Sequence, residues 1–129
     1  MAKRIRDLTP EVLRRALVPL GPLPQRTSEE FTASGDGLVM DLGLNACRDW
    51  SVCVVENGTV TSWDVRFEYS LDAVNWTEIS DLTHTRAITG DGVVKGTTPA
   101  YPATHFRPRV DELTLGGGTN ITVYILGMP

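Results

Sequence analysis

Residues 60–79 read VTSWDVRFEYSLDAVNWTEI, and this stretch decides the fold class. From Trp63 onward, apolar side chains alternate with charged ones, which is the period-two pattern of a strand with one buried face. The apolar set is Trp63, Val65, Phe67 and Tyr69, and the charged set, expected to face solvent, is Asp64, Arg66 and Glu68. A turn over residues 71–74 follows, and Trp76 and Ile79 resume the apolar pattern. We therefore predict a β-hairpin whose aromatic face is covered by another part of the fold.

The rest of the chain after residue 28 has the pattern of turns and short segments that is typical of an all-β fold. Turn signals such as Asn57-Gly58 and Gly116-Gly117-Gly118 separate short segments rich in strand-forming residues. Predicted strands cover residues 29–33, 38–42, 50–56, 60–69, 76–80, 85–89, 93–97, 104–113 and 120–126. We predict an antiparallel two-sheet β-sandwich of about eight strands, jelly-roll or immunoglobulin-like, joined largely by hairpins. Pro108 removes a ladder donor from its strand, so that strand is expected to lie at an edge or to be broken.

Ahead of the predicted sandwich domain, residues 28–129, lies a basic arm, residues 1–27. Its first 26 residues carry six basic and two acidic side chains, a charge of +4, which leaves −8 for the rest of a chain whose net charge is −4. Thr9 as a cap and Pro10 at the first position predict a short helix, and the Pro-rich segment from Pro19 ends it. One face of this helix is apolar, with Leu13, Ala16, Leu17 and Leu20 at i, i+3, i+4 and i+7.

Composition limits the class of protein. At 129 residues, with 41% hydrophobic and 22% charged residues, the chain is expected to form one globular domain. We find no apolar run long enough to cross a bilayer and no secretory signal pattern, so we expect no membrane partner and synthesis in the cytoplasm. The two cysteines, Cys47 and Cys53, are expected to be reduced, buried thiols.

No arrangement of residues predicts catalysis, a cofactor or a metal site. His84 and His105 have no nucleophile motif nearby, so we do not expect an enzyme. Asp72 and Asn75 fit local turn hydrogen bonds better than a calcium loop, and the glycine run at 116–118 precedes a strand, which favours a flexible hairpin connection over a phosphate loop. The acidic body argues against specific nucleic-acid binding, leaving only non-specific contacts by the arm.

Two segments carry a resemblance to a known class. VRFEYSLDAVNWTEI (65–79) and HFRPRVDELTLGGGTNITVYILGM (105–128) resemble small β-sandwich proteins encoded among the virion-structure genes of tailed bacteriophages. The resemblance covers about residues 29–128. It differs at Tyr69 and Ala73, where the pattern prefers glycine, and at Pro108.

The resemblance implies a virion structural protein, and first of all a capsid decoration (cement) protein made in the host cytoplasm and located on the capsid surface. Its partner would be the major capsid protein, and a homotrimer is the expected oligomer. The partner-binding residues would lie in the arm: Arg4, Arg6, Leu13, Arg14, Arg15, Leu17 and Leu20. Two alternatives stay open. One is a tail or neck protein. The other is a carbohydrate-binding module that uses tryptophans, although we expect Trp50, Trp63 and Trp76 to fill the core.

Overall fold

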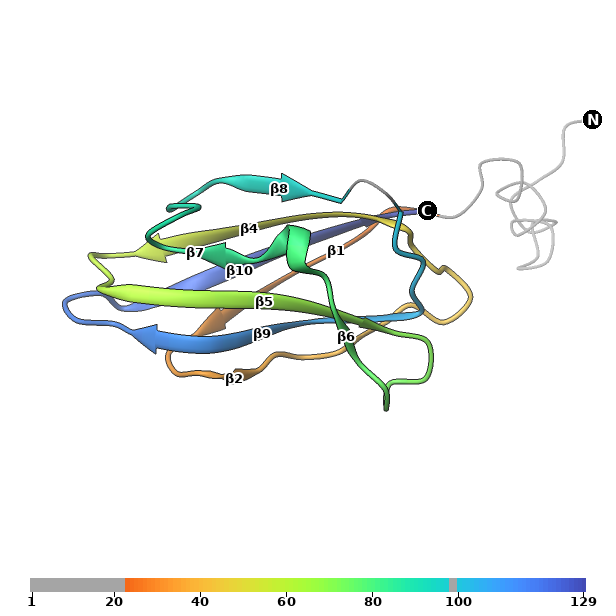
Figure 1. Cartoon of the computed structure of the whole chain (residues 1–129), viewed down its shortest axis with the longest axis horizontal. Coiled ribbons are helices and arrows are strands. Elements are labelled where there is room, and N and C mark those ends of the chain that lie inside the picture. The colour runs from red at the N-terminus through yellow and green to blue at the C-terminus, as the bar shows by residue number, and fades with distance from the viewer. Residues whose placement is uncertain (1–22, 98–99) are drawn as a thin grey trace, which may run out of the picture.

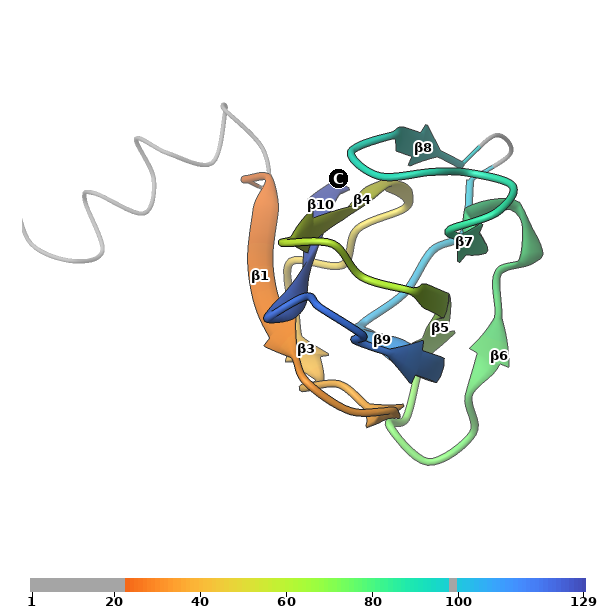
Figure 2. The ribbon, with the colours of Figure 1, turned by 90° about the vertical axis from the view of Figure 1, so that its left-hand side faces the viewer.

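A computed structural model describes residues 23–97 and 100–129, which form two antiparallel sheets packed face to face (Figures 1 and 2). Sheet A has the order β1 (Gln25–Phe31), β10 (Asn120–Met128), β4 (Asp49–Asn57) and β8 (Val94–Gly96). Sheet B has the order β2 (Gly35–Asp36), β9 (His105–Thr114), β5 (Ser62–Ser70) and β6 (Thr77–Glu78). Two short strands also pair in this sheet, β3 (Met40–Asp41) with β9 and β7 (His84–Thr85) with β5. The 3-10 turn η3 (Ser80–Leu82) follows β6. The predicted two-sheet β-sandwich is confirmed. Within these residues no helix has the length and apolar character needed to span a membrane.

The first strand starts earlier than the expected domain boundary at residue 28. Gln25, Arg26 and Thr27 pair with Gly127, Leu126 and Ile125 of β10, so they belong to sheet A. The predicted short helix and the arm residues ahead of Leu23 lie outside the described residues.

The core confirms the predicted burial of the aromatic face of residues 63–69. Trp63, Val65 and Phe67 are buried, and Tyr69 packs at the edge of the core. Trp50 of sheet A stacks on Phe106 of sheet B, with ring centroids 3.9 Å apart and an interplanar angle of 10°. These contacts join the two sheets, because burying large aromatic surfaces is the main favourable contribution to folding.

The tip of the β5–β6 hairpin is organised by Asp72. Its Oδ1 accepts hydrogen bonds from the backbone N–H groups of Val74 (2.9 Å) and Asn75 (2.8 Å), and Ser70 Oγ accepts from the N–H of Ala73 at 2.9 Å. The bonds that Asp72 accepts, above all the one from the Asn75 N–H, hold the pKa of Asp72 well below its usual range. The predicted turn role of Asp72 is confirmed, and the turn places Ala73 at φ 61, a left-handed conformation that favours glycine.

Replacing Ala73 with glycine is therefore expected to stabilise the protein by about 0.5–1 kcal/mol, because the Cβ strain of the left-handed conformation disappears. Chemical denaturation of the A73G variant measures this directly. Val74→Gly is the matched control, since Val74 is exposed and is not among the positive-φ residues. That control should lower stability, and a loss of stability in A73G as well would contradict the strain assigned to Ala73.

Two connections that we expected to be hairpins instead pass between the sheets. Asn57-Gly58 joins β4 of sheet A to β5 of sheet B, and the glycine run joins β9 of sheet B to β10 of sheet A. The connections pack against each other, and the N–H of Thr119 donates to the carbonyl of Asn57 at 2.8 Å. A Cβ on Gly116 would lie 2.1 Å from Thr61 Oγ1, so this close approach requires glycine at position 116. The sequence had predicted only a flexible connection here.

Pro108 lies in a continuous strand with neighbours on both sides, so the expectation of an edge or broken strand is wrong for β9 itself. The interruption is in the neighbour, because β2 and β3 flank residues 37–39, which form no strand. The carbonyl of Pro108 accepts from the N–H of Gly37 at 2.8 Å, which places the proline nitrogen on the same side of β9. The missing donor thus faces the interruption, where no ladder bond is lost.

Candidate interaction surface

The outer face of sheet A is apolar and exposed. Along β10, Ile121, Val123 and Ile125 point into the core, and the intervening residues point outward. Among these outward residues, Tyr124 is 48% exposed and Met128 is 41% exposed, with Leu126 between them. A run of large apolar side chains on the outside of a monomer is typical of an interaction site.

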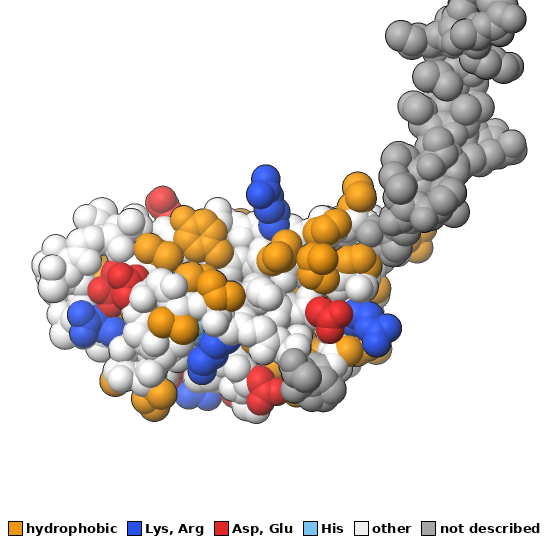
Figure 3. Space-filling model, turned by 90° about the horizontal axis from the view of Figure 1, so that it is seen from above, with side chains coloured by type: hydrophobic (Ala, Val, Ile, Leu, Met, Phe, Trp, Pro, Cys, Tyr) orange, Lys and Arg blue, Asp and Glu red, His pale blue; other side chains and the backbone are white. Residues whose placement is uncertain are grey.

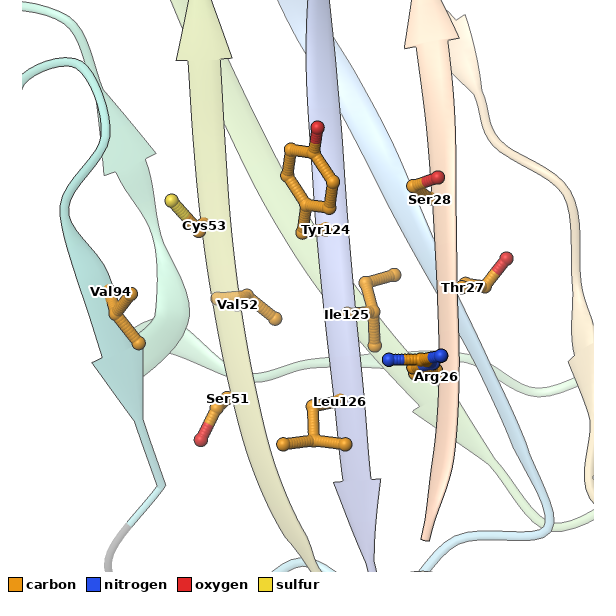
Figure 4. Close-up of a pocket in the computed structure, with 10 residues that line it drawn as sticks. All are labelled: Arg26, Thr27, Ser28, Ser51, Val52, Cys53, Val94, Tyr124, Ile125 and Leu126. Atoms are coloured by element: carbon orange, nitrogen blue, oxygen red, sulfur yellow. The ribbon is translucent and has the colours of Figure 1, made fainter.

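This face is hollowed into a groove of about 630 Å³ (Figure 4). Tyr124 and Leu126 of β10 lie in the middle, flanked by Ser51 and Cys53 of β4 on one side and by Arg26 and Ser28 of β1 on the other, and Val94 of β8, 67% exposed, lies beyond β4. Figure 3 shows apolar side chains gathered over this side of the molecule. Because these side chains are exposed, the described part of the chain leaves the groove uncovered.

Cys53 places a thiol in this groove, which corrects the expectation that both cysteines are buried. Cys47 is buried as predicted, Cys53 is only half-buried, and both are free thiols. Partial burial raises the pKa of the Cys53 thiol, and the nearby carboxylate of Asp91 raises it further. The raised pKa lowers the reactive thiolate fraction, but the partly exposed Cys53 thiol is accessible to reagents within the apolar groove.

The sequence contains a signal for this face that our prediction from the sequence missed. In NITVYILGM, residues 120–128, apolar side chains occupy both alternating sets of positions, whereas a strand with one solvent face shows only one apolar set. A strand that is apolar on both faces predicts that something covers each of them. Sheet B covers the inner face, and the outer face has no cover in the described residues.

The outer face of sheet B has the opposite character and carries a network of ion pairs. Glu68 lies at its centre, and its carboxylate oxygens form ion pairs with Arg107 Nε at 3.0 Å and Arg109 Nη1 at 2.9 Å. The other members are Arg66, Asp64, Glu78, Asp111 and Asp36. We expected Glu68 to face solvent, but it is only 6% exposed, because the two arginines cover it. The charges on this face are paired with one another, so the face offers fewer free charges to a partner.

The tryptophans give little support to a sugar-stacking surface. Trp50 and Trp63 are buried in the core, as expected. Trp76 is half-buried on the outside of sheet B, where the guanidinium of Arg107 lies 4.2 Å from its ring centroid, so the expectation that it fills the core is wrong. Of the three tryptophan rings, the one that is not buried is therefore occupied by a cation–π contact.

The histidines have structural partners. His84 is buried, with Nδ1 2.7 Å from the carbonyl oxygen of Leu82 and Nε2 2.9 Å from that of Val93. His105 lies on β9, with Nδ1 2.9 Å from Thr104 Oγ1. Among the residues that the structure describes, no three His, Cys, Asp or Glu side chains come together as a metal site.

All seven predicted partner-binding residues, Arg4, Arg6, Leu13, Arg14, Arg15, Leu17 and Leu20, precede Leu23 and lie outside the described ranges, 23–97 and 100–129. Their placement stays a prediction. The described residues do fix where the arm joins the body. The arm enters β1 at Gln25, which pairs with Gly127, next to the outward side chains of Leu126 and Met128.

Comparison with known proteins supports the fold. No protein-family model and no curated protein matches the chain. Among solved structures, the SPBc2 prophage-derived protein YomS is similar, with a TM-score of 0.55 and 17% sequence identity over 81% of this chain and 94% of that chain. At this identity the likeness establishes a shared sandwich fold.

Proposed function

We propose that the protein is a structural component of a tailed-bacteriophage virion, and specifically a capsid decoration protein that binds the outer shell through its arm and forms a homotrimer. The observation that carries the proposal is the fold shared with a prophage-derived protein. This fold agrees with the sequence resemblance of residues 65–79 and 105–128 to phage virion sandwiches. The major capsid protein is the proposed partner.

The surfaces of the body suit this function. A decoration protein needs a stable body, one surface that faces its partners and one that tolerates solvent. The groove around Tyr124 and Leu126 offers apolar surface to a partner, while the opposite outer face, on sheet B, is polar and its charges pair with one another. The basic arm adds charge that is attracted to an acidic shell surface.

Deleting residues 1–22 is expected to abolish binding to shells purified without this protein, because the proposed contacts of the four arm arginines with the shell disappear, together with the apolar contacts of the three arm leucines. The sandwich should remain folded, since β1 begins at Gln25 and stays complete. Co-sedimentation with the shells measures attachment, and circular dichroism checks the fold. Attachment of the folded, truncated protein at full affinity would sink the proposed role of the arm.

A further inference from the structure

The groove of sheet A and the entry of the arm lie close together. Arg26 pairs with Leu126 near the start of the β1–β10 ladder, and Arg26 itself lines the groove. The chain therefore reaches the sandwich at the edge of its exposed apolar face. We propose that this groove binds the apolar side of residues 10–18 from a second copy of the chain.

The sequence of the arm supplies the apolar occupant. The predicted helix presents Leu13, Ala16 and Leu17 on one side. A helix of about two or three turns is marginal in water, so it requires an apolar surface to cover that side. The groove is such a surface, with Tyr124, Leu126 and Val94 exposed and uncovered in the described residues.

The linker favours binding of the arm to the groove of a neighbouring molecule over binding to the groove of its own molecule. Residues 19–24 read PLGPLP, and their three prolines favour an extended chain. Six residues in this conformation span about 19 Å at ~3.1 Å per residue. Leu126 lies only one residue along β10 from the partner of Gln25. In this conformation the linker would place residues 10–18 away from the point where the chain joins its own groove and within reach of a neighbour.

This contact joins two different surfaces, an arm and a groove, so it is a head-to-tail contact that can close into a ring. It deepens the proposed function and rests on the oligomer proposed there, since three such contacts would close the expected trimer. The helix pattern also places Arg15 opposite the apolar side, where it stays available to the shell. The two sides of the arm therefore contact two different partners, the apolar side a neighbouring copy and the basic side the shell.

The proposed contact between arm and groove can be tested by cross-linking to the native thiol of Cys53 in the purified full-length protein. We would introduce Leu17→Cys and treat an equal mixture of ¹⁵N-labelled and unlabelled protein with a short bis-maleimide. The expected products are covalent dimers and trimers, with residue 17 of one molecule linked to Cys53 of another. Cys47 is buried and should not compete. Arg15→Cys, on the opposite side of the predicted helix, is the matched control and should give much less of this link.

A second measurement removes the apolar side of the arm without adding a thiol. The double variant Leu13→Gln and Leu17→Gln should turn the oligomer into a folded monomer and raise the rate of Cys53 alkylation by about tenfold, because burial of leucine side chains no longer covers the groove. Arg15→Gln should leave both readouts unchanged.

A link between residue 17 and Cys53 of the same molecule would overturn the inference in favour of an arm that folds back. An unchanged oligomer with unchanged Cys53 reactivity would overturn it in favour of another occupant. Neither result would bear on the location of the protein in a virion.

Discussion

Replacing Trp50 with alanine is expected to lower the free energy of unfolding by about 3–5 kcal/mol, the largest effect of any single change that we predict. Trp50 is only 1% exposed, and its ring stacks on Phe106 across the two sheets. Its Nε1 donates to the carbonyl of Tyr101 at 3.1 Å, so truncation leaves both a cavity and an unpaired acceptor. Urea denaturation of the wild-type and W50A proteins measures the difference.

Two variants provide controls for the Trp50 prediction. Trp76→Ala removes the same side chain from a half-buried site outside the core and should cost only about 1 kcal/mol, since this truncation mainly removes the cation–π interaction with Arg107. Trp50→Phe keeps an aromatic ring against Phe106 and should fall between the two alanine variants. Equal losses of stability in W50A and W76A would show that the stack does not join the sheets as described.

Replacing Glu68 with glutamine is expected to destabilise the protein by about 3 kcal/mol, because it removes the buried carboxylate that Arg107 and Arg109 share and places an N–H donor against one of these guanidinium groups. Glu68 accepts from Arg107 and Arg109 and is shielded from solvent by both. The variant keeps the shape of the side chain, so the loss of stability reports charge and not packing. The measurement is again chemical denaturation.

Asp111→Asn is the matched control for Glu68. Asp111 pairs with the same Arg109, at 2.6 Å, but its side chain is 34% exposed. A pair that is open to solvent contributes about 0–1 kcal/mol and is weakened by salt. The loss of stability in D111N should therefore be small and decrease with salt, whereas the loss in E68Q should persist. Similar small losses in both variants would contradict a buried network centred on Glu68.

Much of the fold could be predicted because the pattern of residues 60–79 is local. Alternation of Trp63, Val65 and Phe67 identifies the buried face without knowledge of the partner sheet. The route of the chain between the sheets could not be predicted in this way. Asn57-Gly58 is a strong hairpin signal, yet the packing of this turn against Gly116–Gly118 makes it an inter-sheet connection. Pro108 is tolerated for a similar non-local reason, the interruption between β2 and β3.

The candidate surface was harder to predict than the core. The burial of Glu68 depends on two arginines from β9 that are about 40 residues away in sequence, as the register of β5 and β9 requires. The apolar outer face is present in residues 120–128 as a double alternation, but only the structure identifies which set points outward. Because the arm is basic, the sequence predicted a partner-binding site at residues such as Arg14 and Arg15. It did not predict the groove residues Tyr124, Leu126 and Cys53.

The central claim, a decoration protein on the capsid, is tested most directly by counting and locating the protein in intact particles of the phage or induced prophage that encodes it. Quantitative mass spectrometry gives the number of copies per particle, and cryo-electron microscopy gives their position. We predict on the order of hundreds of copies on the outer shell, because a symmetric shell repeats each binding site many times. A few copies at the tail or neck, or none in the particle, would contradict the claim.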